Sequence, residues 1–489
     1  MGEIVAFILY FILILGIGLY FFAKTKNGAN SYFLGDRQMN KWVVAMSAQS
    51  SDMSGWLLMG LPGSIFAFGM GKVWIAVGLA IGTYLNWLFT AERLRRFTEV
   101  AGNAITIPEY LQNRFKTSSK ALRIISAIVF FVCFTVYAAS AFKAGGMVFS
   151  TVFHVSFNTA TIIFSIIVLA YTFLGGFQAV CWTDFVQGLL MLFAILLAPI
   201  FAYFAMNGID SGFFASIDPH FLSAVPGGRF SYSAFATIIS GLAWGLGYFG
   251  MPHILVRFMS IKNPQEIKDS RRIATIWVIF ALGGAVAVGL IGRAFLPELI
   301  DGNSEYVFVE MVRKLFPPFI AGILLSAIIA ASMSTADSQL LVASSAFTSD
   351  VYKPIIRKEA TDKEMIWVGR MVVLIIAIVA FFMAINPNSK NIMGLVENAW
   401  AGFGASFGPV VILSLYWKRL TNRGAICGII LGGVTVFLWI FLGLSTSTQL
   451  YEIIPGFAMG MLGALVGSLT DKKPSQEVLD MCDEAMAKN

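Results

Sequence analysis

Residues 48–71, AQSSDMSGWLLMGLPGSIFAFGMG, decide the fold class of this 489-residue chain. Asp52 and its neighbouring serines stand inside a long apolar run, and Gly60 and Pro62 follow shortly after them. An unbroken helix is disfavoured here, because Pro lacks a main-chain donor and Gly leaves the backbone loose. The stretch therefore predicts a membrane-spanning segment that is interrupted near its middle.

A second interrupted segment, GLAWGLGYFGMPH, lies at residues 241–253. We expect the two segments to be the second and seventh spans of the chain, each opening one of two structural halves. Paired spans with Gly and Pro interruptions point to a transporter, because unwound backbone at mid-membrane leaves dipoles free for ions and substrate.

The composition requires a membrane environment. Hydrophobic residues make up 57% of the chain and charged residues only 12%, whereas a soluble protein carries about 25% charged residues. The net charge of +7 is typical of a membrane protein with basic cytoplasmic loops, so no nucleic-acid partner is expected. The four cysteines are widely scattered, which argues against disulfides or a metal centre.

Hydropathy predicts about thirteen transmembrane helices in an all-α polytopic membrane protein. Their approximate limits are 3–23, 42–70, 73–92, 122–152, 158–175, 183–205, 232–258, 273–296, 316–347, 365–385, 392–416, 424–444 and 451–470. The first of these is interpreted as a retained helix rather than a signal peptide, because no cleavage site follows it. The charged tail from Asp471 is predicted to be a short solvated end.

The basic residues predict the orientation of the chain. Alternate connections and the C-terminal tail hold 27 of the 34 Lys and Arg residues. Because the cytoplasmic side of a membrane protein is rich in Lys and Arg, we expect the C-terminus inside and the N-terminus outside.

The whole chain is expected to form a single transporter domain. Its predicted parts are an extra N-terminal helix and loop (1–40), a first repeat (41–205), an external loop (206–231), a second repeat (232–417), two extra C-terminal helices (418–470) and a cytoplasmic tail (471–489).

The ninth span, AGILLSAIIAASMSTADSQLLVASS at residues 321–345, is rich in hydroxyl groups. Neutral hydroxyls and main-chain carbonyls suit a hard monovalent cation such as Na⁺. The alternative is that these serines and threonines are small packing residues of a membrane helix.

Three acids lie at or near membrane depth. Asp52 predicts a functional site, because a buried charge in a membrane is costly; it alternatively caps the helix at the break. Asp184 and Asp337 either hold an ion or balance a basic group such as Lys143. Two neighbouring carboxylates resist ionising together, so proton coupling is a variant of the same idea.

Aromatic residues near the interruptions are either core residues or a cage for an apolar ring-shaped solute. Trp244 and Tyr248 stand four residues apart on one face of the seventh span. The chain has no phosphate-binding loop and no nucleophile with a matching base, so neither an ATP-driven pump nor an enzyme is expected.

Five stretches of the chain resemble the sodium:solute symporter family, and in particular its proline-carrying bacterial branch. They are SSDMSGWLLMGLPG, WGLGYFGMPHILVRFM, AGILLSAIIAASMST, AWAGFGASFGPV and LYEIIPGF. The resemblance runs from the first span to about Gly456. It implies a leucine-transporter-type core with an inverted five-plus-five repeat, in the bacterial inner membrane. It also implies sodium-coupled symport of L-proline into the cell by alternating access, with no cofactor beyond the coupling ion and no obligatory protein partner.

The resemblance also assigns roles to individual residues. It implies sodium binding by Ser50, Met53, Ala331, Ser334 and Thr335, coupling by Asp52 and Ser54, and substrate binding by Gly55, Trp56, Tyr137, Trp244, Tyr248 and Pro252. A second cation or proton site is expected at Asp184, Asp337 and Ser338. Arg37 and Arg370 match basic residues on the cytoplasmic side of the family.

Two other functions stay open at this point. One is a sodium symporter for another small solute, such as a carboxylate, pantothenate or a sugar. The other is a membrane sensor built on a transporter fold, although the tail is too short to hold a signalling domain.

Overall fold

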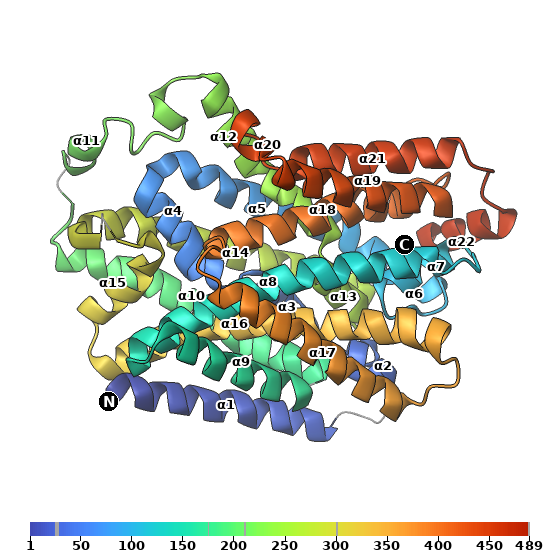
Figure 1. Cartoon of the computed structure of the whole chain (residues 1–489), viewed down its shortest axis with the longest axis horizontal. Helices are drawn as coiled ribbons and strands as arrows, with labels where there is room; N and C mark the ends of the chain where they lie inside the picture. The colour runs from blue at the N-terminus through green and yellow to red at the C-terminus, as the bar shows by residue number, and fades with distance from the viewer. Residues whose placement is uncertain (25–28, 175, 210–211, 300–301, 488–489) are drawn as a thin grey trace.

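The computed structural model describes residues 1–24, 29–174, 176–209, 212–299 and 302–487. Every regular element in this part of the chain is a helix, and the helices are accompanied by an isolated bridge between Met39 and Ile261. The long helices lie roughly along one axis of the molecule, with the N-terminus at one end and the C-terminal helix at the other (Figure 1). The predicted all-α class is therefore confirmed.

A single helix forms the greater part of each of the expected spans other than the two interrupted ones. These helices are α1 (Gly2–Lys24), α5 (Val73–Asn86), α8 (Ala121–Phe153), α9 (Phe157–Leu174), α10 (Phe177–Ala205), α14 (Ile267–Phe295), α16 (Pro318–Ala346), α17 (Asp362–Ile385), α18 (Ile392–Tyr416), α19 (Asn422–Phe441) and α21 (Ile453–Leu469). The two expected interrupted spans are each built from more than one helix: α3 (Lys41–Asp52), η2 (Trp56–Gly60) and α4 (Leu61–Phe68), and α12 (Tyr232–Ala243), η6 (Trp244–Gly250) and α13 (Pro252–Ser260).

Length and apolarity alone identify fewer spans than the sequence predicted. Within the described residues nine helices are long and apolar enough to cross a membrane, or ten if the bent pair Tyr232–Gly250 and Pro252–Ser260 is one span. The difference arises because α9 and α21 are shorter apolar helices and because Trp56–Val100 counts as one segment. Gly69, at φ 71°, turns the chain between α4 and α5 within that segment. Each predicted span still coincides with a helix or a group of helices.

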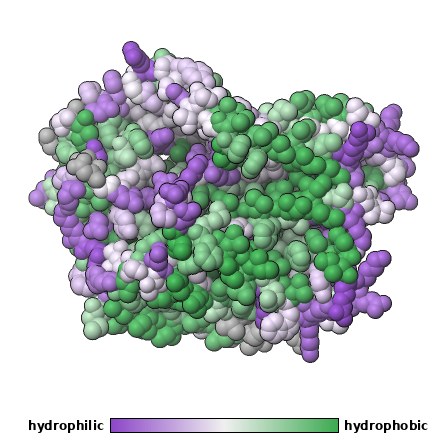
Figure 2. Space-filling model, in the orientation of Figure 1, coloured by the Kyte–Doolittle hydropathy of each residue, from purple (hydrophilic) through white to green (hydrophobic). Residues whose placement is uncertain are grey.

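The surface has the pattern of a protein embedded in a bilayer. Hydrophobic residues form a band across the middle of the face shown in Figure 2, and hydrophilic residues gather at its two ends. Large apolar side chains such as Phe204 and Phe441 are more than two-thirds exposed, at 71% and 74%. Water does not favour such exposure over a wide area, whereas lipid does. The chain is a multi-pass membrane protein.

The two interrupted spans meet in the interior of the bundle. α3 packs against α10, α13, α14 and α16, so the first interruption is enclosed on several sides by other helices. In Figure 1 the labels of α3, α13 and α16 lie together near the centre of the bundle. This arrangement brings both interruptions to the same depth and buries the polar residues that they carry.

The prediction of a solvated C-terminal tail is wrong. Residues Gln476–Ala487 form helix α22, whose face of Val478, Met481, Cys482 and Ala485 is buried. These residues recur at helical spacing, and they pack on α6 (Glu92–Val100). Lys116 pairs with Glu477 at 3.2 Å and adds a charged contact at the rim. The charged residues of the tail concealed this apolar stripe.

Candidate functional site

The first interruption lies where the sequence predicted it. α3 ends at Asp52, Met53 leaves helical geometry at φ −79° and ψ 73°, and the next helical segment begins at Trp56. The N–H of Ser54 donates to the carbonyl of Asp52 at 2.9 Å, which turns the chain sharply. Gly55 sits against α8, because a Cβ there would lie 2.5 Å from the Cβ of Ala144. The close approach of two helices explains a glycine at this position.

The second interruption is longer. α12 ends at Ala243, residues 244–250 form a tight 3₁₀ segment, and Met251 is extended at φ −81° and ψ 106°. α13 then starts at Pro252, where a missing N–H does no harm in the first turn of a helix. The two helical halves are bent by 49°. The interruption therefore leaves the N-terminus of α13 inside the protein.

The residues predicted to bind sodium converge where α16 crosses the first interruption. The Ser334 hydroxyl donates to the carbonyl of Ser50 at 2.9 Å and lies 3.2 Å from the carbonyl of Ala331. Met53 and Thr335 are fully buried, and the Thr335 hydroxyl has no hydrogen-bond partner. Since buried polar groups are normally paired, this unpaired oxygen marks a place for a missing partner. The oxygens gathered here suit a hard monovalent cation.

Asp52 joins the two interruptions. Its side chain is fully buried, and its Oδ2 accepts a hydrogen bond of 2.6 Å from the Tyr248 hydroxyl. Its main-chain carbonyl accepts from the Tyr137 hydroxyl at 3.1 Å and from the Trp56 indole at 3.4 Å. Gly55 precedes the next helical segment, and no side chain caps that segment. The alternative reading of Asp52 as a helix cap is therefore wrong.

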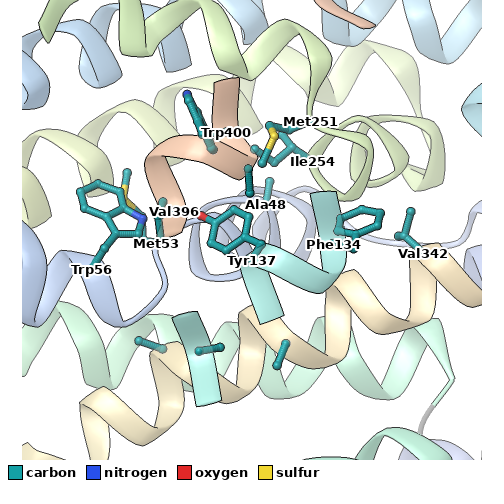
Figure 3. Close-up of a cluster of buried hydrophobic side chains, with 14 of the residues drawn as sticks. Ala48, Met53, Trp56, Phe134, Tyr137, Met251, Ile254, Val342, Val396 and Trp400 are labelled. Atoms are coloured by element: carbon teal, nitrogen blue, oxygen red, sulfur yellow. The ribbon is translucent and has the colours of Figure 1, made fainter. Parts of the chain in front are cut away.

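Aromatic side chains gather around this junction. The rings of Trp56 and Trp244 lie 6.3 Å apart, and Tyr137 faces the His253 ring at 6.4 Å. Figure 3 shows Trp56, Met53, Tyr137 and Trp400 around one buried cluster. The residues predicted to bind substrate therefore lie in one buried region, although they come from three separate parts of the chain.

Asp184 and Asp337 are both fully buried. Asp184 Oδ2 accepts from the Ser47 hydroxyl at 2.6 Å and from Arg257 at 3.2 Å. Ser338 lies 3.5 Å from the same oxygen and also contacts Arg257. Both carboxylate oxygens of Asp337 lack a hydrogen-bond partner. The predicted cluster thus forms, but it contains an arginine that the prediction omitted.

Lys143 does not balance these acids. Its ammonium group donates to the Ser389 hydroxyl at 3.1 Å and to the Lys390 carbonyl at 2.8 Å. The partner of Asp184 is Arg257, whose guanidinium also donates to the Ser47 hydroxyl and the His253 carbonyl. A lone arginine in an apolar span needs a buried anion. That rule was the available signal for Arg257, which lies in the stretch WGLGYFGMPHILVRFM but was not predicted to be a site residue.

Arg37 joins several segments through its hydrogen bonds. Its guanidinium donates to Asn103 at 2.7 Å, to the Ala104 carbonyl at 2.8 Å and to the Met259 carbonyl at 2.6 Å. Burial lowers the pKa of Arg37 to about 10, so the group stays charged at neutral pH. Arg370 donates to the Phe173 carbonyl at 3.0 Å. Arg37 thus fastens the chain before α3 to the end of the second interrupted span.

No group of three or more His, Cys, Asp or Glu residues able to hold a metal ion occurs in the ranges that the structure describes.

Comparison with known proteins identifies the family. Residues 32–432 match the model of the sodium:solute symporter family. The sodium/proline symporter of Escherichia coli is 46% identical over 99% of this chain and 96% of its own length. The osmoregulated proline transporter OpuE of Bacillus subtilis is 45% identical over 96% of this chain and 94% of its own.

A solved structure supports the same fold. A sodium-coupled sialic acid symporter in its outward-open state superposes with a TM-score of 0.82 at 19% identity, covering 97% of this chain and 99% of that one. The predicted leucine-transporter-type architecture is thereby confirmed. Two interrupted spans, a hydroxyl-rich helix between them and near full-length similarity lead to one conclusion: the chain belongs to the sodium:solute symporter family.

Proposed function

We propose that this chain is a sodium-driven symporter that carries L-proline into the bacterial cell. The observation that carries the proposal is the hydrogen bond of 2.6 Å from Tyr248 to Asp52, which links the two interruptions directly. The name of the E. coli relative, sodium/proline symporter, supplies the ion and the substrate. The family model matches residues 32–432, and the chain is a transporter and not an enzyme.

Sodium binds at the first interruption. The carbonyls of Ser50, Met53 and Ala331 and the hydroxyls of Ser334 and Thr335 are the ligands. The contact of Ser334 with two of these carbonyls and the unpaired Thr335 hydroxyl support this set. When the ion arrives, the Ser334 hydrogen turns away and its oxygen lone pairs face the cation.

Asp52 and Ser54 couple the ion to the substrate. Both flank Met53, and Asp52 Oδ1 and the Ser54 hydroxyl are buried without partners. Sodium bound beside Asp52 fixes the orientation of its carboxylate and therefore of Tyr248. Coupling of this kind is reciprocal, so proline tightens sodium binding by the same factor. A potential of about 100 mV adds about 2.3 kcal/mol of drive for each sodium ion.

Proline binds between the two interruptions. Trp56, Tyr137, Trp244 and Tyr248 surround its ring, and Gly55 and Pro252 border the site. The inner N-terminus of α13, a helix of 9 residues, offers the main-chain N–H of His253 to the substrate carboxylate, because Pro252 has no N–H and the N–H groups of Ile254 and Leu255 donate to the Met251 carbonyl. The clustering of the four aromatic side chains supports this assignment.

Asp184, Asp337 and Ser338 form a second cation site. Arg257 offsets the charge of one of the two carboxylates, so the pair requires one further positive charge if both are ionised. Sodium fills this role, with a proton as the alternative. Sodium-to-proline stoichiometry in the Asp337→Asn variant distinguishes them: a lower ratio supports sodium, and an unchanged ratio removes the sodium site.

The N-terminus faces outward and the C-terminus lies in the cytoplasm. The Lys and Arg count and the placement of the two termini at opposite ends support this orientation. The division into repeats at 41–205 and 232–417, each opening with an interrupted span, belongs to the same proposal. Fusions of a reporter that is active only in the cytoplasm test this orientation. Activity is expected at the C-terminus and not at the N-terminus, and the opposite result reverses the assignment.

The test of the function is proline uptake into proteoliposomes with an imposed sodium gradient. We expect accumulation of labelled proline that collapses when sodium is equal on both sides. Competition by carboxylates, pantothenate and sugars tests for another substrate. Uptake that persists without sodium contradicts the proposal.

A further inference from the structure

Trp400 contacts the second interruption from outside it. This residue lies on α18, is 1% exposed, and was not among the predicted site residues. Its indole N–H donates to the main-chain carbonyl of Trp244 at 2.8 Å. An indole has one donor and no acceptor, so this bond uses its whole hydrogen-bonding capacity.

The fit between Trp400 and the interrupted span leaves no spare room. A Cβ on Gly247 would lie 1.9 Å from the indole nitrogen of Trp400. One turn further along α18, a Cβ on Gly404 would lie 2.8 Å from the Cα of Gly247. Both glycines are needed for this close approach, which places the Trp400 ring directly against the backbone of the 3₁₀ segment 244–250.

Trp400 also contacts the two aromatic residues of the interruption. Its ring meets Tyr248 edge-on, with centroids 5.1 Å apart at 88°, and lies 6.3 Å from Trp244 at 28°. Tyr248 in turn donates to Asp52. The ring contact with Trp400 on α18 therefore helps to position the Tyr248 side chain, whose hydroxyl bonds to Asp52.

We propose that Trp400 is a positioning residue that sets the shape of the substrate site through its N–H bond to Trp244. The inference rests on the proposed function, because Trp244 and Tyr248 are assigned to the proline site there. The bond joins the 3₁₀ segment 244–250 to α18 in a buried part of the molecule. Without it the segment shifts, and both aromatic side chains move with it.

The rival explanation is that Trp400 is an ordinary packing residue. Trp277 provides the matched control, because it is 3% exposed and donates its indole N–H to the Gly188 carbonyl at 3.0 Å. Trp277 joins α14 to α10 and makes the same kind of bond, but to a carbonyl of the long helix α10 and not to the second interruption. Trp400→Phe and Trp277→Phe thus remove equivalent hydrogen bonds from different places.

The experiment measures half-saturating proline concentration and maximal rate per transporter in proteoliposomes for both variants. We expect Trp400→Phe to raise the half-saturating concentration about tenfold, because the buried hydrogen bond that joins the 3₁₀ segment to α18 is lost. The maximal rate per molecule should change much less. Trp277→Phe should lower the amount of protein in the membrane and leave the half-saturating concentration unchanged.

Equal behaviour of the two variants overturns the inference. Trp400→His, which keeps a ring N–H, is the second variant, and we expect it to shift half-saturation less than Trp400→Phe does. If the Trp400→Phe protein does not accumulate in the membrane, Trp400→His is compared with Trp277→Phe instead. A higher half-saturating proline concentration in Trp400→His than in Trp277→Phe supports the inference, and an equal one overturns it. If the wild-type chain carries another solute, the proposed substrate is wrong, but the same comparison with that solute still decides the role of Trp400.

Discussion

The two interrupted spans differ in how their buried oxygen atoms are paired with hydrogen-bond donors. At the first interruption Asp52 Oδ1 and the hydroxyls of Ser54 and Thr335 are buried without partners. At the second, the carbonyl of Trp244 accepts from Trp400, and the carbonyl of Tyr248 accepts from Asn86 at 3.1 Å. Side chains donate to main-chain carbonyls at both interruptions, but the three unpaired side-chain oxygens lie at the first.

This difference teaches how one fold accommodates two chemically different cargoes. A sodium ion requires several oxygen ligands, so its site must keep lone pairs available. An apolar ring requires shape and aromatic contact, so its site gains from a backbone fixed by neighbouring side chains. Tyr248 connects the two sites, because it belongs to the second interruption and donates to the carboxylate of the first.

The largest effect is expected from Asp52→Asn. The change removes a buried negative charge beside the proposed sodium ligands and alters the acceptor of the Tyr248 hydroxyl. We expect the sodium concentration for half-maximal proline uptake to rise about a hundredfold, from the loss of a charged partner. Membrane abundance, measured by immunoblot, should stay near the wild-type level; a normal sodium response removes Asp52 from the coupling.

Thr335→Ala tests the unpaired oxygen of the first interruption. We expect about a tenfold rise in the sodium concentration for half-maximal uptake, since one ligand is lost without disturbing another bond. Ser326→Ala is the control, because the Ser326 hydroxyl already donates to the Gly322 carbonyl at 2.8 Å on the same helix. If both variants respond alike, the hydroxyls of α16 serve packing and not ion binding.

Tyr248→Phe tests the connection between the interruptions. Loss of the hydroxyl should raise the half-saturating concentrations of sodium and proline together, each about fivefold, because binding linkage is reciprocal. Uptake is measured over a grid of both concentrations. A change in one ligand alone shows that the two sites do not communicate through this bond.

Asn86→Ala is expected to have the smallest effect and to act on the second interruption only. The half-saturating proline concentration should rise about threefold when the Tyr248 carbonyl loses its donor. Sodium binding measured without proline should not change. Asn113→Ala is the control, because Asn113 donates to the Ala101 carbonyl at 2.9 Å far from both interruptions; an equal response of both variants indicates a general loss of stability.

Particular residues show where sequence reasoning succeeded and where it stopped. The interruptions were predictable, because Gly and Pro inside apolar runs act on the local backbone. Arg257 and Trp400 were not, because their partners Asp184 and Trp244 lie on other helices. The buried face of α22 was hidden for a different reason, since the helix carries four charged residues interspersed with its four buried apolar ones.

By itself the sequence determined that this chain crosses a membrane, where its helices lie, which two are interrupted and which end carries the basic residues. These properties follow from hydropathy and from local backbone preference, which act over neighbouring residues. Only the tertiary structure decided that Asp52 bonds to Tyr248, that Arg257 pairs with Asp184 and that Trp400 bonds to the Trp244 carbonyl. The physical reason is that a buried polar group must find a partner, and helix packing determines which distant residue that partner is.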